Sequence, residues 1–451
     1  MTDVEYAVVG AGIAGLAAAT ALRAAGREVV VLEGGAQAGG AARSESIDGH
    51  LVERGPNTFR VPAAMDAFLR EHSLDALLEP ASPASRERFL VRDGALVPVP
   101  MSPIAFVRSP LLTAGGKLRL LAEPFLRRGD PTGESVADFA TRRFGPQTCD
   151  ALIGPFLTGV YAGDETQLGV EAVFPSLAAA ELRSGSVVRG LVAQALRGSA
   201  PKGRAGTWSA RGGIGALAAA LAGALGPCLQ LASRVSRISF ENGSYRLDAA
   251  TESGRSELRA RGLVVAAPAR EAAALVEALD GDAARALAEI AYAPVASVSL
   301  SLATGSTRVP IHGFGFLVPR GEGDALLGCL FPSQLFPGRA PAGRELLTLL
   351  AGGVRRPDAL DLDDDRLVAG LAGELDRVLG LRDAPRTLAI TRWRRAVPQP
   401  GAEHVRIVAA LRERITRRPR IALAGAHLDG VAFGDALASG VRAAQRLLED
   451  R

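Results

Sequence analysis

Hydrophobic residues form short strand-like runs near both ends of the chain, each followed by a stretch with helical character. Apolar residues at 6–10 and 28–33 flank an alanine-rich stretch that reaches Ala25. This order predicts a strand, a turn, a helix and a second strand. Residues 420–449 show strand, turn and helix again, so we expect the C-terminal segment to join the same lobe.

The middle of the chain shows two further kinds of pattern. Apolar residues at three- and four-residue spacing predict helices over residues 63–72, 117–126, 135–144 and 147–157. Short apolar runs predict strands near residues 229–238, 245–249, 262–268, 298–302, 315–318, 326–330 and 346–350. Because the last four runs follow a separate helical stretch, they indicate a second sheet.

Length and composition narrow the class of protein. A chain of 451 residues is too long for a single core, so we expect two or three lobes. The formal net charge of +4 comes from arginine, and no arginine-rich run is interleaved with aromatic residues, so we expect no nucleic-acid partner. The cysteines at 149, 228 and 329 form no close pair, which argues against disulfides or zinc.

No apolar run is long enough to span a membrane, and the chain enters a strand directly after Asp3, without room for a signal peptide. We therefore expect a cytoplasmic protein. The segments 103–112 and 117–128 combine apolar and basic residues. That composition suits a peripheral contact with the inner face of the cell membrane, and equally a helix packed on its own protein with arginines in water.

The first turn carries a nucleotide-binding motif. It has the pattern GxGxxG, comprising Gly10, Ala11, Gly12, Ile13, Ala14 and Gly15. The glycines allow a tight turn, a close approach of backbone to a pyrophosphate and close packing of helix on strand. Glu33, at the end of the second strand, can accept hydrogen bonds from ribose hydroxyls.

Two later segments distinguish FAD from a nicotinamide cofactor. They contain Gly34, Gly39, Gly40, Ala41 and Arg43, and then Gly55, Pro56, Asn57 and Thr58. Here the chain resembles the amine-oxidase-like flavoprotein superfamily, which implies non-covalent FAD beside these residues. The same resemblance adds Val235 on the adenine side, and Ala426, Val431, Ala432 and Phe433 near the flavin.

A nicotinamide enzyme that used flavin as a relay would carry a second GxGxxG unit, and residues 212–215 follow no convincing strand. We therefore expect electrons to leave for molecular oxygen or another acceptor.

Several internal stretches resemble the protoporphyrinogen oxidase family in particular. They are residues 86–91, 156–164, 174–177, 313–319 and 331–332. The resemblance implies that Arg88 holds a substrate propionate, and that Phe314, Gly315, Leu317 and Leu350 line the pocket. Trp393 stands where the family often has an aromatic residue near the flavin. Two positions depart from the family pattern, Pro400 in place of a tyrosine and Gly434 in place of an asparagine.

This resemblance implies an α/β fold in which a Rossmann-like FAD-binding domain is interleaved with a substrate domain that contains a mixed β-sheet, and with a helical lobe. We expect the FAD-binding domain at 1–85, 203–269 and 391–451, the helical lobe at 86–202 and the substrate domain at 270–390. The implied activity is the oxidation of protoporphyrinogen IX by oxygen in haem biosynthesis, with a homodimer as a possible assembly.

Three alternatives stay open at this point: a coproporphyrinogen III oxidase of the same fold, another oxidase or desaturase of the superfamily, and a flavin-binding partner protein without turnover. The histidines are scattered without metal-ligand spacing, so no general base and no metal are assigned.

Overall fold

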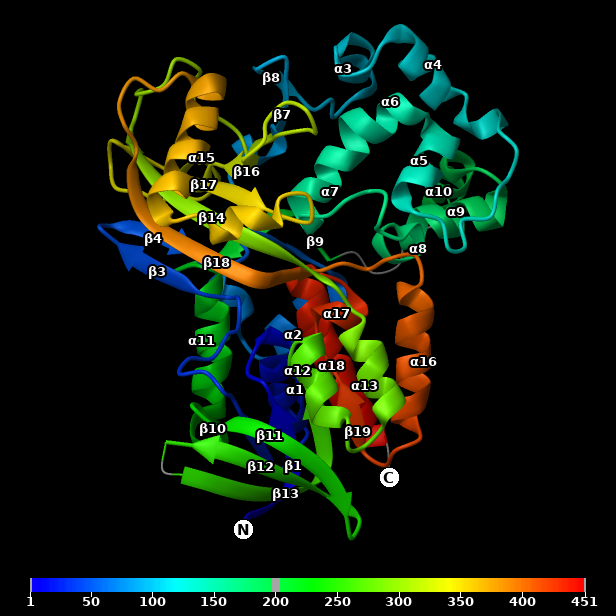
Figure 1. The fold of residues 1–451 in the computed structure, drawn as a ribbon, viewed down its shortest axis with the longest axis vertical. Coiled ribbons are helices and arrows are strands. Elements are labelled where there is room, and N and C mark those ends of the chain that lie inside the picture. Colours follow the sequence, from blue (N-terminus) through cyan, green and yellow to red (C-terminus); the bar gives the residue numbers. More distant parts are fainter. Residues whose placement is uncertain (1, 197–202, 253, 450–451) are drawn as a thin grey trace.

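Two large sheets and a group of helices make up the chain (Figure 1). The computed structural model describes residues 2–196, 203–252 and 254–449. The first sheet has seven strands, in the order β10-β2-β1-β13-β12-β11, with β19 beside β13. These strands are β1 (Thr2–Val9), β2 (Val29–Leu32), β10 (Leu229–Gln230), β11 (Arg234–Glu241), β12 (Ser244–Thr251), β13 (Gly254–Val265) and β19 (Ile421–Leu423).

Alternating side chains of this sheet feed two hydrophobic cores. Val8 in β1 belongs to one core, and its neighbours Ala7 and Val9 belong to the other, as the two-residue period of a strand requires. The first core is covered by α1 (Ile13–Ala24), α2 (Ala63–Glu71), α11 (Ile214–Leu225) and α18 (Phe433–Glu449). The second is covered by α12 (Ala269–Val276), α13 (Gly281–Ala288) and α16 (His404–Thr416).

The second large sheet lies above the first in Figure 1 and has the order β18-β14-β17-β16-β15-β7-β8. Its strands are β7 (Phe89–Arg92), β8 (Ala95–Pro98), β14 (Tyr292–Ala303), β15 (Gly315–Leu317), β16 (Leu326–Leu330), β17 (Arg344–Gly352) and β18 (Arg386–Pro398). The pairs are antiparallel except β15 with β7. Helix α15 (Asp364–Leu379) packs its leucines on one face. The predicted α/β fold with a Rossmann-like lobe and a mixed second sheet is confirmed.

Two small sheets join these lobes. One is the hairpin of β3 (Ser44–Ile47) and β4 (His50–Glu53), and the other pairs β9 (Arg204–Ala210) with β5 (Phe59–Val61) and β6 (Leu78–Pro80). The expectation that residues 212–215 follow no strand is wrong, because β9 ends at Ala210. Buried and exposed residues do not alternate along this strand, which explains why its sequence does not show the hydrophobic alternation typical of a strand.

The helical lobe occupies the upper right of Figure 1. Its helices are α3 (Pro103–Arg108), α4 (Ala114–Leu121), α5 (Val136–Phe144), α6 (Pro146–Thr148), α7 (Gly154–Tyr161), α8 (Val170–Val173), α9 (Pro175–Ser184) and α10 (Val187–Leu196). The helix expected over 147–157 contains a π-helical turn at Cys149–Ile153. Within the described ranges, no helix is long and apolar enough to traverse a bilayer.

The expected domain boundaries stay a prediction. The second sheet crosses them, because β7 and β8 belong to the segment 86–202 and position 391 lies inside β18.

A buried ion pair connects the two lobes at Glu53. Its carboxylate accepts hydrogen bonds from Arg339 Nη1 at 2.6 Å, from Ser44 Oγ at 2.5 Å and from the backbone N–H of Ile214 at 3.0 Å. Arg339 also donates to Ser209 Oγ at 2.6 Å. Burial raises the pKa of Glu53, and the charge of Arg339 opposes that rise. One carboxylate therefore fixes the β3–β4 hairpin, the start of α11 and a loop of the second lobe.

We predict that Arg339→Met destabilises the protein by about 3–5 kcal/mol, because it leaves the buried Glu53 carboxylate without its counter-charge. Urea unfolding followed by circular dichroism measures this loss. Arg417→Met is the matched control, since Arg417 and its partner Glu413 are both about 70% exposed and surface pairs contribute little. Equal stability of the two variants would contradict the role of Glu53.

Candidate active site

The turn between β1 and α1 is built for close backbone approach. Gly10 has a φ of +100°, and a Cβ there would lie 2.9 Å from the carbonyl oxygen of Ala266. A Cβ on Gly15 would strike the carbonyl oxygen of Gly10. Gly12 differs, because a Cβ at this position would meet no atom within 4 Å. The space in front of the α1 N-terminus is therefore open, next to amides that can bind an anion.

Glu33 ties the glycine turn to the end of β2. Its Oε2 accepts from the backbone N–H of Ala11 at 2.7 Å, and its Oε1 accepts from that of Gly35 at 2.7 Å. Gly34 lies beside the side chain of Arg234, whose Cβ is 3.4 Å from a Cβ built on Gly34. This contact brings the start of β11, and thus Val235, next to the nucleotide-binding turn.

The second glycine segment folds against the first. The N–H of Gly39 donates to the carbonyl of Ala11 at 2.8 Å, and a Cβ on Gly40 would lie 3.2 Å from the Cα of Gly12. A Cβ on Gly55 would strike the carbonyl oxygen of Ala41. The motifs that the sequence placed at 10–15, 33–43 and 55–58 are thus brought together.

Residues 54–58 continue toward the second sheet. Trp393 in β18 donates from Nε1 to the carbonyl of Arg54 at 2.7 Å. Thr348 in β17 donates to Asn57 Oδ1 at 3.4 Å, and Asn57 Nδ2 donates to the carbonyl of Gly55 at 3.2 Å. The segment with Pro56 and Thr58 therefore lies between the two sheets, where sequence reasoning placed the flavin side.

The C-terminal unit completes this region. Helix α17 (Ala426–Asp429) leads through Val431 and Ala432 into α18. A Cβ on Gly440 would strike the carbonyl oxygen of Ala14, so α18 lies directly against the first turn of α1. The ring of Phe433 stacks on Phe59 with centroids 5.0 Å apart and is buried. Phe433 can therefore meet a cofactor only through its backbone.

The expected substrate residues lie on or directly before interior strands of the second sheet. The guanidinium of Arg88 lies 4.7 Å from the ring centre of Phe314. Phe314 and Leu317 are half-buried, while Phe316 between them points into the core of the lobe. Leu350 is also half-buried, and Gly328 of β16 pairs with both Leu317 and Leu350. The side chain of Leu317 reaches Gly159 in α7, which joins this part of the sheet to the helical lobe.

The two departures from the family pattern are accommodated locally. A Cβ on Gly434 would lie 3.0 Å from Pro62, so the missing side chain allows β5 to approach α18. The carbonyl of Pro400 accepts from the N–H of Gly169 at 2.8 Å, which ties the end of β18 to the helical lobe.

A known family matches nearly the whole sequence. Residues 13–448 match the flavin-containing amine oxidoreductases. The chain belongs to this family.

Individual relatives align with nearly the whole of this chain. Protoporphyrinogen oxidase 1, chloroplastic, of Spinacia oleracea is 32% identical over 99% of this chain and 84% of its own. Coproporphyrinogen III oxidase of Bacillus subtilis (strain 168) is 27% identical over 96% and 95%. A crystal structure of a candidate protoporphyrinogen oxidase from Exiguobacterium sp. 255-15 shares the fold, with a TM-score of 0.82, 24% identity and 99% coverage of both chains. The protein is an FAD-dependent oxidoreductase.

The residues present fit FAD. Besides the open space at Gly12, Arg43 in the second glycine segment keeps a buried Nε without a hydrogen-bond partner among the described residues. A buried guanidinium nitrogen without a hydrogen-bond partner costs free energy. FAD bound beside the motif would supply that partner.

Sequence reasoning missed His427, which follows Ala426 directly. The side chain is 3% exposed, and its Nε2 has no partner within the described part of the chain. Burial and the charge of His404 lower its pKa to about 4. The imidazole is therefore neutral at pH 7, and its free Nε2 can donate or accept one hydrogen bond. Only its place directly after Gly425 and Ala426 could have drawn attention to it.

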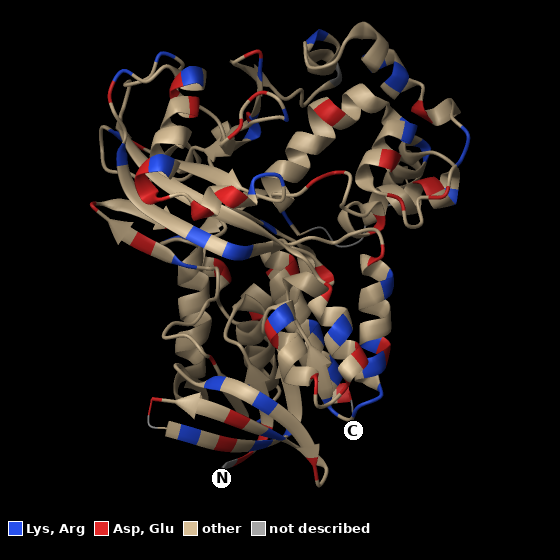
Figure 2. Ribbon diagram, viewed as in Figure 1, with Lys and Arg blue, Asp and Glu red and all other residues tan. Residues whose placement is uncertain are grey.

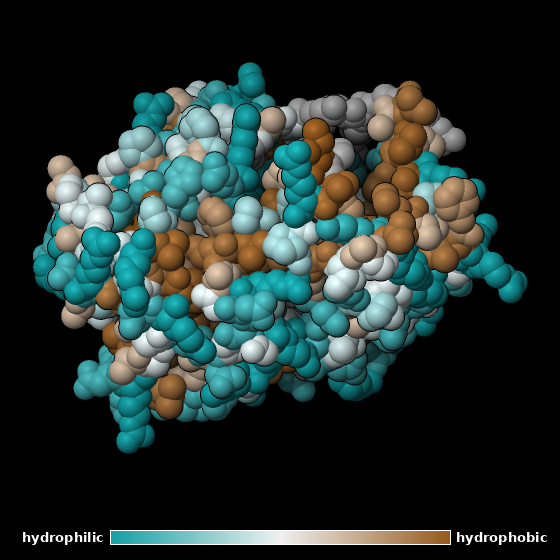
Figure 3. Space-filling view, turned by 90° about the horizontal axis from the view of Figure 1, so that it is seen from above, coloured by the Kyte–Doolittle hydropathy of each residue, from teal (hydrophilic) through white to brown (hydrophobic). Residues whose placement is uncertain are grey.

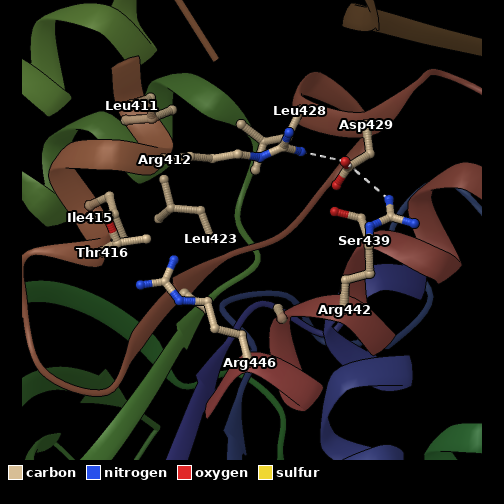
Figure 4. Close-up of a pocket in the computed structure, with 12 residues that line it drawn as sticks. Leu411, Arg412, Ile415, Thr416, Leu423, Leu428, Asp429, Ser439, Arg442 and Arg446 are labelled. Carbon is tan, nitrogen blue, oxygen red and sulfur yellow. Dashed lines mark hydrogen bonds and ion pairs between the residues drawn. The ribbon is translucent and has the colours of Figure 1, made fainter. Parts of the chain in front are cut away.

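A cavity of about 280 Å³ lies elsewhere, between α16 and α18 (Figure 4). Arg412 and Arg442 both pair with Asp429 at its edge, at 2.5 and 3.0 Å. None of the cofactor or substrate residues expected from the sequence lines it, so it is not the active site.

We predict that Gly12→Ala folds normally but binds FAD at least tenfold more weakly, because its methyl group enters the open space where backbone must approach the pyrophosphate. Titration of the apoprotein with FAD, followed by flavin fluorescence, measures the change. Gly223→Ala in α11 is the control, since Gly223 also has open space around it. Unchanged affinity in Gly12→Ala would remove this turn from the FAD site.

Proposed function

We propose that the protein oxidises protoporphyrinogen IX to protoporphyrin IX in haem biosynthesis, with FAD as its cofactor. The observation that carries this proposal is the position of Arg88, whose guanidinium lies over the ring of Phe314, on the sheet that also presents Leu317 and Leu350. A guanidinium beside a flat apolar wall matches a macrocycle with carboxylate side chains. The similarity to protoporphyrinogen oxidases supports the choice of substrate.

Each part of the chain has a defined role in this proposal. The segments 10–15, 33–43 and 55–58, together with Val235, Trp393 and residues 426–433, hold the cofactor. When bound, FAD supplies the redox chemistry, taking hydrogen from the substrate and passing electrons to molecular oxygen. Arg88 pairs with a carboxylate, and Phe314, Gly315, Leu317 and Leu350 shape a pocket that orients the ring and excludes water.

Coproporphyrinogen III is the second candidate substrate. The coproporphyrinogen III oxidase of Bacillus subtilis aligns with 96% of this chain, and this substrate carries more propionates. The same wall and the same guanidinium would serve either macrocycle, so the choice depends on the number of basic groups in the pocket.

We expect the purified FAD-bound protein to form a fluorescent porphyrin from protoporphyrinogen IX under air, faster than autoxidation. Coproporphyrinogen III in parallel assays tests the second candidate, and the larger kcat/KM identifies the substrate. Protein that keeps its FAD but oxidises neither compound would contradict the proposed function.

We also propose that the helical lobe binds the inner face of the cell membrane. Large apolar side chains gather on its surface, as the brown area on the right of Figure 3 illustrates. We call these residues the apolar patch: Met101, Ile104, Val107, Leu118, Leu121, Phe125, Val188, Val192 and Leu196. Phe125 is 89% exposed, although Glu123 nearby is fully buried. Extended exposed apolar surface is typical of an interaction site.

The interior of this lobe holds a charged group beside its apolar core of Val136, Phe139, Leu157, Tyr161, Leu168, Val170 and Val187. Arg143, Glu123 and Glu181 are all fully buried, and Arg143 pairs with both carboxylates. Glu123 also accepts from the backbone N–H groups of Val187 and Val188 at 2.8 and 3.1 Å. This contact places the start of α10 next to the Glu123–Phe125 turn.

The charges around the apolar patch are basic. Helices α3 and α4 carry Arg108, Lys117 and Arg119 and no acidic residue (Figure 2). Arg127 and Arg128 follow. Apolar side chains bordered by arginine and lysine suit a membrane with anionic lipid headgroups. This chemistry supports a peripheral location on the cytoplasmic leaflet.

We expect the protein to float with vesicles that contain phosphatidylserine, and Leu118→Glu/Phe125→Glu to abolish flotation, because each burial contributes about 1.5–3 kcal/mol. Leu231→Glu, a change at an exposed leucine in the turn directly after β10, is the control. Light scattering of the same samples tests the expected homodimer. Wild-type protein that stays in the pellet while the vesicles float would refute membrane binding.

A further inference from the structure

The cavity between α16 and α18 is separate from the expected active site (Figure 4). Its volume of about 280 Å³ is roughly twice that of a cavity that holds one benzene molecule, about 150 Å³. The cavity can therefore take an apolar group larger than a single ring, but not a complete tetrapyrrole. Apolar side chains from all four surrounding elements line it: Leu411, Ile415, Ala422, Leu423, Leu428 and Ala443.

Three arginines and one acid supply the charges of this lining. Arg412 comes from α16, Arg442 and Arg446 come from α18, and Asp429 ends α17. Three guanidiniums against a single carboxylate leave the lining with a net positive charge. A positively charged cavity with apolar walls favours an anion that carries an apolar group.

Asp429 holds two of the arginines in place. Its Oδ1 accepts a hydrogen bond from Arg412 at 2.5 Å and lies 3.0 Å from Arg442 Nη2. Burial raises the pKa of Asp429, but a hydrogen bond from Ser439 and the charges of Arg442 and Arg412 outweigh this effect, so the pKa lies below its ordinary value. The carboxylate is therefore ionised at neutral pH. Because a guanidinium has several N–H groups, both arginines keep donors for a ligand.

Ser439 anchors this arrangement in the core of the lobe. Its side chain lines the cavity and is 1% exposed. Its Oγ accepts from the backbone N–H of Gly425 at 3.0 Å, and Gly425 begins the turn into α17. The position of Asp429 is thus fixed relative to β19 and α18. The two paired guanidiniums are ordered before a ligand arrives, which lowers the cost of binding it.

Arg446 has no such partner. It is half-buried and forms no ion pair with another residue in the ranges 2–196, 203–252 and 254–449. Its side chain extends from α18 toward Thr416, away from Asp429 (Figure 4). A half-buried guanidinium without a counter-charge is stabilised when an anion binds to it.

We propose that this cavity is a second ligand site, which binds a small amphipathic carboxylate. The acid group pairs with Arg446, and the apolar chain lies against Leu423 and Leu428. Pairing of a planar carboxylate with a guanidinium is favourable, and burial of the chain adds the hydrophobic contribution. The site is distinct from the proposed substrate pocket, and the inference does not depend on the proposed oxidase activity.

The test titrates octanoate into the FAD-loaded protein by isothermal calorimetry. Acetate carries the charge without the chain, octylammonium carries the chain with the opposite charge, and inorganic phosphate is an anion without an apolar part. Arg446→Met removes the guanidinium but keeps an apolar side chain, and Arg446→Lys keeps the charge. Arg417→Met is the matched control, because Arg417 is an exposed arginine directly after α16 and does not line the cavity.

We expect octanoate to bind the wild type with a Kd on the order of 0.1–1 mM, which suits a ligand of this size. Acetate, octylammonium and phosphate should bind at least about tenfold more weakly, because each lacks either the chain or the negative charge. Arg446→Met should raise the Kd of octanoate about tenfold to a hundredfold, the range for a hydrogen bond to a charged group. Arg446→Lys should recover part of the affinity, and Arg417→Met should match the wild type.

Three other results would overturn the proposal. Octanoate that binds Arg446→Met as tightly as the wild type lies elsewhere on the protein. Equal affinity for octylammonium would show that the arginines play no part, and equal affinity for phosphate would show that the apolar walls play none. Wild-type protein that takes up no octanoate has no such site, whatever the variants do. Circular dichroism and FAD content show whether each variant is folded, and the comparison of the four probes on the wild type does not depend on any variant.

Discussion

The buried carboxylate of Glu53 is the contact on which the arrangement of the two lobes depends. It receives hydrogen bonds from the β3–β4 hairpin, from the start of α11 and from Arg339 in the second lobe. A Cβ on Gly213 would strike Ser44 and approach Glu53 Oε1 to 3.0 Å. The glycine pair before α11 thus serves this junction and not a second nucleotide. Because a buried charge is tolerated only when paired and hydrogen-bonded, the network leaves little freedom for the lobes to shift.

The cofactor side could be predicted from sequence because most of its constraints are local. Gly10 is required by its positive φ, Gly15 by its contact with the carbonyl of Gly10, and Gly12 by the open space in front of α1. Glu33 adds a bond to the same turn from the end of the next strand. Motifs of this kind are specified by backbone geometry over a few residues, so their spacing is visible in the chain.

Other features depend on contacts between distant segments. His427 gave no signal, because what distinguishes it is the burial of its side chain and an Nε2 without a partner among the described residues. Strand β9 was missed since its residues show no alternating burial. Periodicity predicted helices in the lobe at 103–196, but it could not tell which face is covered. There an ion pair, Arg143 with Glu123, is buried, whereas Leu118 and Leu121 of α4 are exposed.

A series of contacts also connects the junction at Glu53 to Arg88. Arg339 follows α14 (Pro332–Leu335), where the carbonyls of Gln334 and Leu335 accept from the Oγ and N–H of Ser82 at 2.6 and 2.8 Å. Ser82 leads through a short turn to Arg88. Hydrogen bonds and short stretches of chain therefore connect the buried ion pair to Arg88. A guanidinium that is held in place before the substrate arrives need not be ordered when a carboxylate binds, which is how a rigid site gains affinity.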